Sequence, residues 1–412
     1  MKFNLKKNWI SFSWIGFSVL AILLIVIGLW WKTSFTEQAT IRVGVLHSLS
    51  GTMAVSEAPL VDAVQLAIEE INSAGGINNQ EITAIVADCR SDPDYCAQQA
   101  ERLITEENVQ VLFGCWTSSC RKAVKTVVEK HQHLLVYPLQ YEGMEKSAHI
   151  LYTGAAPNQQ IIPGTRWAME HFGQRLFLVG SDYIFPRTAN IIIRDLAHNS
   201  SGKIVAEHYL PLGSADVASI IRDIQEKKPD VILNTLNGDS NTHFFSQLVK
   251  AGLTDVPIIS FSVAESEMLA WGGTHLNQHY GVWSYFQSLA NEENRRFVST
   301  FKARFGADRV TSDPIETAYI GVHLWAQAAN EAGSTDARYL DPILLQQGIP
   351  SPSGVVAINT KTRHLWKMVR VGKVQADGQF KQVYASDAPL RPYPWPIYRT
   401  RSTWQNIMQS LP

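Results

Sequence analysis

The sequence predicts an α/β protein built from two lobes, and three observations carry this prediction. Short apolar strands alternate with amphipathic helices, which is the pattern of a parallel, doubly wound sheet. The alternation runs from residue 41 to about residue 137 and starts again near residue 159. The chain has 412 residues, more than one ordinary hydrophobic core accommodates.

The first lobe begins with a strand at Ile41 and is punctuated by clear start and stop signals. Gly75-Gly76 ends its first helix, and Asp92-Pro93 supplies an N-cap and a first-turn proline for the second. The predicted strands are 41–46, 82–87, 109–113 and 134–137, and the predicted helices are 59–71, one from residue 93, and 119–131.

The second lobe repeats this pattern and is followed by a helical region and a β-rich tail. The predicted helices are 159–172, 188–198, 217–226 and 242–251, and the strands are 176–180, 204–210, 231–236 and 258–262. Helices 291–305 and 314–332 follow, then strands 355–359, 364–371 and 380–384, with a turn at Ala376-Asp377-Gly378. The proline-rich segment 389–396 is expected to be an ordered strap over one lobe.

The N-terminal region predicts the compartment. Three lysines precede an apolar run, Trp14 to Trp31, which is long enough to cross a bilayer. Because the positive flank is N-terminal, the globular part is expected outside the cytoplasm, anchored in the cytoplasmic membrane by a transmembrane helix. A signal peptide cleaved near 36–39 is the competing interpretation, and the protein would then be released to the periplasm.

The four cysteines are Cys89, Cys96, Cys115 and Cys120. An extracytoplasmic location permits disulfides, and no C-x-x-C pair favours zinc. One or two local disulfides are therefore expected and no metal, with Cys89–Cys96 as the favoured pair. Other pairings, and four buried thiols, remain open.

Composition and motifs argue against an enzyme and against nucleic acid. The formal net charge is −1, and no basic run follows the first residues. Ser119 and Lys122 match S-x-x-K, but its partner motifs are absent, as are P-loop, G-x-G-x-x-G and H-E-x-x-H patterns. Glu265 and Glu267 lie at a helix start, where acids are favoured anyway. No catalytic residue and no cofactor are predicted.

Two loops carry the prediction of a binding site. Gly114 to Ser119 follows one apolar strand, and Ser181 to Arg187 follows another, in each case before a helix. Each loop places hydroxyl and aromatic groups at a helix N-terminus, where backbone N–H groups lack partners. Ligands of such sheets bind at the carboxyl ends of the strands, so the two loops are expected to face one site.

Several loop motifs together resemble a known family. They are Phe113 to Ser118 with Arg121-Lys122-Ala123, Tyr137-Pro138, Tyr141-Glu142-Gly143, Gln159-Gln160, Gly180 to Tyr183 with Pro186-Arg187, and Tyr285 to Ser288. These residues resemble the urea and short-chain-amide substrate-binding proteins of ABC transporters, and almost equally the related amide-sensing regulator. Both have the type I periplasmic-binding-protein fold, near the branched-chain amino-acid binders.

The resemblance implies two Rossmann-like lobes with three crossovers, near Thr153, Trp283 and Ile349. The domains would be 1–39 (anchor and linker), 40–153 with 284–348 (lobe 1), and 154–283 with 349–412 (lobe 2). The family's pocket maps onto Trp116, Ser118, Tyr137 and Tyr183, with Thr117 beside them. Gly238 lies in a loop, Asn237 to Ser240, that is more polar here than the resemblance predicts.

The function implied is binding of urea or a short aliphatic amide and its delivery to an ABC permease. Ser118 and helix amides would donate to the ligand's carbonyl, and aromatic walls at Trp116 and Tyr183 would limit its size. Glu142, Asp182 and Arg187 are expected to hold the loops. The alternatives are a membrane-tethered sensor that controls a signalling partner, such as a histidine kinase, and an amide-hydrolysing enzyme.

Overall fold

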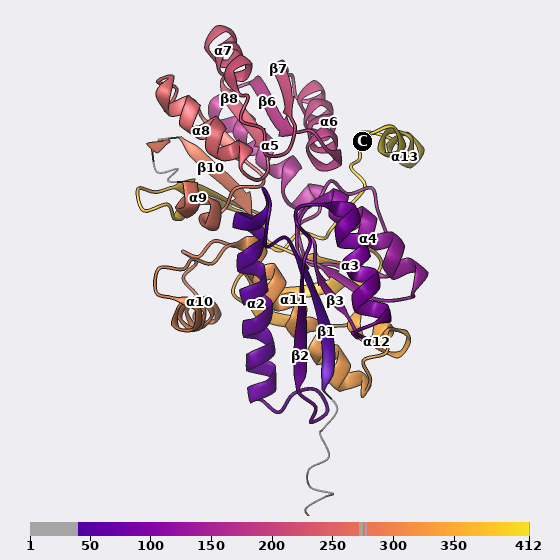
Figure 1. Cartoon of the computed structure of the whole chain (residues 1–412). Coiled ribbons are helices and arrows are strands. Elements are labelled where there is room, and N and C mark those ends of the chain that lie inside the picture. Colours follow the sequence, from indigo (N-terminus) through magenta and orange to yellow (C-terminus); the bar gives the residue numbers. More distant parts are fainter. Residues whose placement is uncertain (1–39, 272–274, 277, 412) are drawn as a thin grey trace, which may run out of the picture. The chain divides into compact units, whose positions relative to one another are not determined.

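The computed structural model describes residues 40–271, 275–276 and 278–411. Residues Ile41–Pro412 form one compact unit, coloured from indigo to yellow in Figure 1. Within the described residues, no helix has the length and apolarity needed to cross a membrane. The apolar run Trp14 to Trp31 lies outside them.

The first sheet has the strand order β11-β12-β13-β5-β4-β3-β1-β2. Its central strands pair in parallel, whereas β11, β12 and β13 pair with one another in antiparallel fashion. Its strands are β1 (Ile41–His47), β2 (Ile82–Asp88), β3 (Leu112–Gly114), β4 (Leu135–Tyr137), β5 (Ile150–Tyr152), β11 (Gly348–Ser351), β12 (Gly354–Asn359) and β13 (His364–Trp366). Figure 1 shows α2 lying alongside β1 and β2.

The helices of this first lobe are α2 (Ala54–Ser73), α3 (Pro93–Thr105), α4 (Ser118–Lys130), α10 (Glu292–Phe305), α11 (Asp313–Ala332) and α12 (Ala337–Leu344). Helix α3 begins as predicted, because the Asp92 side chain accepts a hydrogen bond from the Tyr95 amide at 2.9 Å. Helix α11 is buried on most of its sides and packs against α2. Gly321 lets it approach β4, because a Cβ there would lie 2.8 Å from Val136 Cγ1.

The second sheet has the order β15-β14-β10-β9-β8-β6-β7. Its strands are β6 (Arg175–Ser181), β7 (Lys203–Leu210), β8 (Val231–Thr235), β9 (Ile258–Ser260), β10 (His279–Trp283), β14 (Arg370–Val374) and β15 (Phe380–Ala385). Its helices are η1 (Pro157–Gln159), α5 (Ile161–Phe172), α6 (Ile184–Asn199), α7 (Ala218–Lys227), α8 (Ser240–Lys250), α9 (Glu265–Trp271) and α13 (Arg401–Ser410). Two separate apolar clusters pack on this sheet, whereas the first sheet has one.

The two-lobed α/β architecture is as predicted, but the sheets are mixed rather than purely parallel. The tail strands cause the difference. β13 joins the first sheet parallel to β5, but β12 and β11 then add in antiparallel fashion, as β14 and β15 do in the second sheet. The expected turn at 376–378 joins β14 to β15, with Gly378 at φ 79°. The sequence did not predict α13, which carries few apolar residues. Its buried Trp404 donates through Nε1 to the Pro396 carbonyl at 2.8 Å and anchors the helix.

The chain passes between the sheets three times, after β5, after β10 and after β13. The first two places lie at the predicted positions near Thr153 and Trp283. Because β11, β12 and β13 belong to the first sheet, the third passage follows Trp366 rather than Ile349. The division into domains stays a proposal, and sheet membership would move its boundary at 348/349 to the segment after Trp366.

A buried ion pair ties these three connections together. Lys367 is 1 % exposed and donates through Nζ to the Thr153 carbonyl at 3.1 Å. Its Nζ lies 3.9 Å from Asp313 Oδ2, which accepts from the Ser284 amide at 2.9 Å and the Tyr285 amide at 3.0 Å. One cation and one carboxylate therefore contact all three passages between the lobes.

We predict that Lys367→Met destabilises the protein by about 3–5 kcal/mol, because Asp313 is left as a buried charge without its cation. Chemical denaturation monitored by tryptophan fluorescence measures this change. The control is Lys381→Met on the exposed face of β15, which should shift stability by less than about 0.5 kcal/mol. Equal effects of the two substitutions would contradict a structural role for the Lys367 charge.

Candidate ligand-binding site

The loop after β3 is shaped by a residue pair with positive φ. Gly114 has φ 157°, and a Cβ there would lie 2.1 Å from the Leu46 carbonyl oxygen. Cys115 follows in the left-handed region, at φ 65°, and its amide donates to the same carbonyl at 2.9 Å. The chain turns here at the carboxyl end of β3, which is where a parallel sheet places its ligands.

The turn leads into the first residues of α4. Thr117 is the N-cap of this helix, and its Oγ1 accepts a hydrogen bond from the Cys120 amide at 3.1 Å. Among the described residues, no acceptor contacts the amides of Ser118 and Ser119, the first two positions of the helix. These two N–H groups are free donors, as the geometry of a helix start requires.

Ser118 is held by a buried cluster of charged groups. Its Oγ donates to Glu142 Oε2 at 2.5 Å and accepts from Arg121 Nη1 at 2.8 Å. Arg121 also donates through Nη2 to Glu142 at 2.9 Å and through Nε to Glu145 at 2.9 Å. Arg121 and Glu142 are fully buried. The hydroxyl proton of Ser118 is thus used within the protein, while one lone pair of its oxygen remains for a ligand N–H group.

Arg121 lowers the pKa of Glu145. Burial alone would raise the pKa of Glu145, but Arg121, and then Lys125 and Lys122, outweigh it and lower the pKa to about 2. The Arg121 guanidinium also lies over the rings of Tyr137 and Tyr141, at 5.1 Å and 4.5 Å. The sequence offered Arg121 only as part of the family motif and did not predict this role.

Trp116 and Tyr137 meet beside the cluster. The Tyr137 hydroxyl donates to the Trp116 carbonyl at 2.7 Å, and both residues are buried. Trp116 Nε1 donates in turn to Asn237 Oδ1 at 3.2 Å. Asn237 lies in the loop after β8, so Trp116 joins loops that belong to the two different sheets.

Gly238 lies at a second contact between the lobes. It has φ 61°, and a Cβ there would lie 2.7 Å from Thr52 Oγ1 in the loop after β1. The next residue, Asp239, donates its amide to the same Thr52 oxygen at 3.1 Å. Glycine is therefore required here for close approach of two backbones, which is a different role from contact with a ligand.

Tyr183 lies at the start of α6, on the lobe opposite Ser118. Its phenol has a pKa well above the ordinary value, through burial first and then through Tyr137 and the carboxylates of Glu142 and Glu57. These electrostatic interactions place Tyr183 in the same neighbourhood as the charge cluster. The loop behind it is held by an ion pair between Asp182 Oδ1 and Arg187 Nε at 2.5 Å, as expected from the sequence.

Glu57, on α2, adds a second acidic group. It accepts from the Ser48 amide at 2.9 Å and lies 3.1 Å from His47 Nδ1. His47 is fully buried, and no described residue forms a hydrogen bond with its Nε2. Neither residue was predicted as part of the site, because nothing in the sequence separates a His-Glu pair here from ordinary core and loop residues.

The six predicted site residues therefore fall into three groups. Tyr137 bonds to Trp116, Arg121 bonds to Ser118, and the Arg121 guanidinium over the Tyr137 ring links the two pairs. Tyr183 interacts with this group electrostatically. Thr117 caps α4 with its hydroxyl, and Gly238 allows the lobes to approach. The S-x-x-K match at Ser119 and Lys122 was not predicted to be catalytic, and in the structure Lys122 Nζ lies 4.0 Å from Glu145 Oε2.

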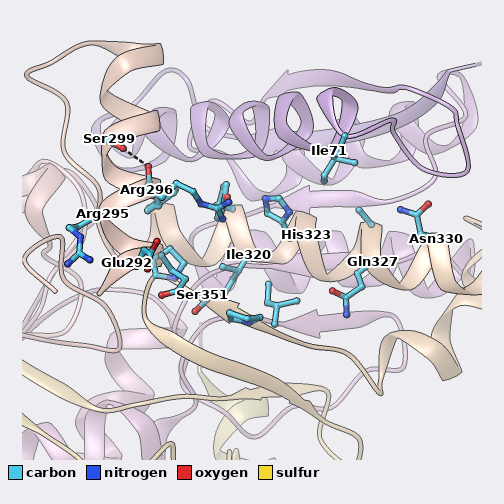
Figure 2. A pocket seen from close by; sticks show the side chains of 18 of the residues that line it. Ile71, Glu292, Arg295, Arg296, Ser299, Ile320, His323, Gln327, Asn330 and Ser351 are labelled. Atoms are coloured by element: carbon cyan, nitrogen blue, oxygen red, sulfur yellow. Dashed lines mark hydrogen bonds between the residues drawn. The ribbon is translucent and has the colours of Figure 1, made fainter. Parts of the chain in front are cut away.

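The first lobe also carries a groove that lies apart from the predicted site residues. It has a volume of about 1140 Å³ and lies between α2, α10, α11 and the β11 turn, as Figure 2 shows. Ile71 and Ile320 contribute apolar surface to it, and Arg295 and Arg296 contribute charge. None of the predicted site residues line it, and nothing in the structure shows what covers it.

Comparisons with known proteins agree with this architecture. The sequence profile of a family described as periplasmic binding protein domain matches residues 41–401. A Leu/Ile/Val-binding protein homolog 8 from Brucella suis is 22 % identical over 389 residues, 87 % of this chain and 94 % of that protein. A limonene hydroxylase from Geobacillus stearothermophilus is 38 % identical over only 119 residues, and this chain spans 22 % of its length.

Two solved structures illustrate the fold. A solute-binding protein of an ABC transporter from Rhodopseudomonas palustris, in complex with benzoate, has a TM-score of 0.77 at 16 % identity, covering 86 % of this chain and 98 % of that one. A branched-chain amino acid transporter substrate-binding protein from Streptococcus pneumoniae, in complex with isoleucine, has a TM-score of 0.73 at 20 % identity, covering 84 % and 99 %.

We predict that Glu145→Gln loses up to about 3 kcal/mol of stability at pH 7. The pKa of Glu145 is lowered on folding, so its contribution is present above pH 4.5 and is lost as the pH falls toward 2. The gap between variant and native protein should therefore close over this window in urea denaturation series. An exposed control, Glu293→Gln, should show no such pH-dependent gap. A gap for Glu145→Gln that stays constant with pH would contradict the prediction.

Proposed function

Because the chain belongs to the periplasmic binding protein family over residues 41–401, we propose that it binds urea or a short aliphatic amide outside the cytoplasm and delivers it to an ABC permease. Members of this family bind a solute without changing it chemically, which confirms the expectation that the chain is not an enzyme. The extracytoplasmic location of the family also suits the two disulfides.

The observation that carries the choice of ligand is the charge balance around Ser118. All three nitrogens of Arg121 already bond to Ser118, Glu142 and Glu145. The pKa of Tyr183 is raised by burial first and then by Tyr137, Glu142 and Glu57, while Arg121 acts in the opposite direction. A ligand carboxylate at this place would meet repulsion without a free cation, whereas a neutral molecule rich in N–H donors suits the available acceptors.

The hydrogen-bond donors and acceptors of an amide are complementary to the acceptors and donors that remain available at the site. The carbonyl oxygen would accept from the free amides of Ser118 and Ser119 at the start of α4. An amide N–H would donate to the unused lone pair of Ser118 Oγ or to the Tyr183 oxygen. The aromatic side chains of Trp116 and Tyr183 would exclude water. A four-atom ligand such as urea gains at most about 1.5 kcal/mol of binding free energy per heavy atom. Tight binding therefore requires nearly all of these hydrogen bonds.

Related proteins offer two competing solute classes. One similar structure holds isoleucine and another holds benzoate, and both of these ligands carry a carboxylate. These likenesses are at 20 % and 16 % identity and bear on the fold rather than on the solute. The charge balance described above favours a neutral amide over either of them.

We predict that calorimetric titration of residues 40–412 gives a binding isotherm with urea, acetamide or formamide. The amide groups satisfy free donors and acceptors, and no charge must be buried. Leucine and 4-hydroxybenzoate serve as the comparison ligands and should give little or no heat. Binding of either carboxylate ligand together with no heat from any amide would reject the proposed ligand class.

We predict that Ser118→Ala weakens amide binding by about 1–3 kcal/mol, because a buried ligand N–H loses its acceptor and Glu142 loses a donor. The matched control is Ser119→Ala in the same helical turn, which keeps its backbone amide and should bind as tightly as the native protein. Thermal unfolding of both variants separates loss of binding from loss of fold. Equal affinities of the two variants would remove the Ser118 hydroxyl from the site.

A further inference from the structure

The four cysteines form one compact group of sulfur atoms. They are paired as Cys89–Cys96, the pair favoured by the sequence, and Cys115–Cys120. The two disulfides touch, because Cys120 Sγ lies 3.2 Å from Cys96 Sγ. The sulfurs of Cys89, Cys96 and Cys120 all lie within 4.8 Å of one another, and all four residues are buried.

The packing of α3 against α4 creates this contact. Cys96 lies in the first turn of α3, and Cys120 lies in the first turn of α4. The two helices pack side by side with these first turns adjacent. The N-terminus of a helix stabilises a thiolate, so a sulfur released at either position is held as a nucleophile.

We propose that this group is a thiol–disulfide exchange site whose second stable pairing is Cys96–Cys120. A small dithiol first reduces Cys115–Cys120 and is itself oxidised to a cyclic disulfide, which leaves two thiols on the protein. The Cys120 thiolate then attacks Cys96 Sγ, the Cys96–Cys120 bond forms, and Cys89 leaves as a thiolate that takes up a proton. The exchange itself consumes no electrons, and the two-electron reduction is supplied by the dithiol.

The exposed fractions of the four cysteines indicate which disulfide a reductant reaches first. Of the four cysteines, Cys120 is the most exposed, at 7 %. A cavity of about 10 Å³, room for about one water molecule, touches both disulfides through Cys89 and Cys120. Since both disulfides occupy all four sulfurs, the group in this form offers no thiolate to a metal ion.

The exchange would act on the proposed ligand site, and this consequence rests on the proposed function. Trp116, Thr117 and Ser118 lie inside the ring that Cys115–Cys120 closes. In the exchanged form that ring is open, and the loop keeps only non-covalent restraints, such as the hydrogen bonds from the Cys115 amide to Leu46 and from Tyr137 to the Trp116 carbonyl. The loop then loses preorganisation, and affinity for an amide should fall by about tenfold.

The test is disulfide mapping of the full chain, purified in detergent, after brief exposure to limiting dithiothreitol and trapping with N-ethylmaleimide. The expected two-electron-reduced species carries alkylated Cys89 and Cys115 and a Cys96–Cys120 disulfide, identified by mass spectrometry of peptides. A species with both Cys115 and Cys120 alkylated and an intact Cys89–Cys96 bond would overturn the proposal, since it shows reduction without exchange.

Two double variants give a second, independent measurement. Cys89→Ser with Cys115→Ser leaves only Cys96 and Cys120, which dissolved oxygen should oxidise to a disulfide during purification, the oxygen being reduced to hydrogen peroxide. The matched control, Cys89→Ser with Cys120→Ser, leaves Cys96 and Cys115 and should keep both as thiols. Free thiols in the first variant would overturn the proposal.

Titration with acetamide distinguishes a failure of the exchange proposal from a failure of the proposed ligand. The Cys89→Ser, Cys115→Ser variant should bind acetamide about tenfold more weakly than the native chain. Equal affinity would overturn the coupling between exchange and the binding loop. If the native chain binds no amide, the proposed function fails, while the mapped Cys96–Cys120 bond still decides the exchange.

Discussion

The ion cluster of Arg121 with Glu142 and Glu145 is the interaction on which the proposed ligand site depends. A buried arginine is tolerable only because each of its nitrogens has an acceptor, and two carboxylates are tolerable only because they share it. Ser118 is one of those acceptors, so its oxygen is fixed by the cluster rather than by its own rotamer preference. The electrostatics that stabilise this part of the first lobe therefore also set the polarity of the group offered to a ligand.

A second buried charge pair, Lys367 with Asp313, plays the corresponding role for the connections between the lobes. It contacts the chain at each of the three passages between the sheets. Rotation of the lobes must be absorbed by backbone close to these contacts, because hinge motions concentrate in a few residues at element ends. Buried, paired charges thus stabilise both the proposed site and the connections between the lobes.

The sequence predicted local features well and long-range partnerships poorly. The N-cap at Asp92, the turn at Gly378 and the Cys89–Cys96 bond each depend on residues close together in the chain. By contrast, Glu142 lies 24 residues from Ser118, and Lys367 lies 214 residues from Thr153. No periodicity links such pairs. The addition of β11 to β13 to the first sheet was missed for the same reason, because edge strands choose their sheet through non-local pairing.

Direct hydrogen bonds between the lobes help to explain how a very small ligand could stabilise their closed arrangement. Trp116 bonds to Asn237, and Thr52 bonds to Asp239 beside Gly238, so the lobes hold each other through protein groups alone. A ligand shifts an open–closed equilibrium only by its differential affinity for the two states. Urea can contribute about 6 kcal/mol at most, and part of that offsets its own lost freedom. Closure around so small a molecule is therefore feasible only because contacts such as Trp116–Asn237 supply a share of the free energy, and the ligand supplies the remainder.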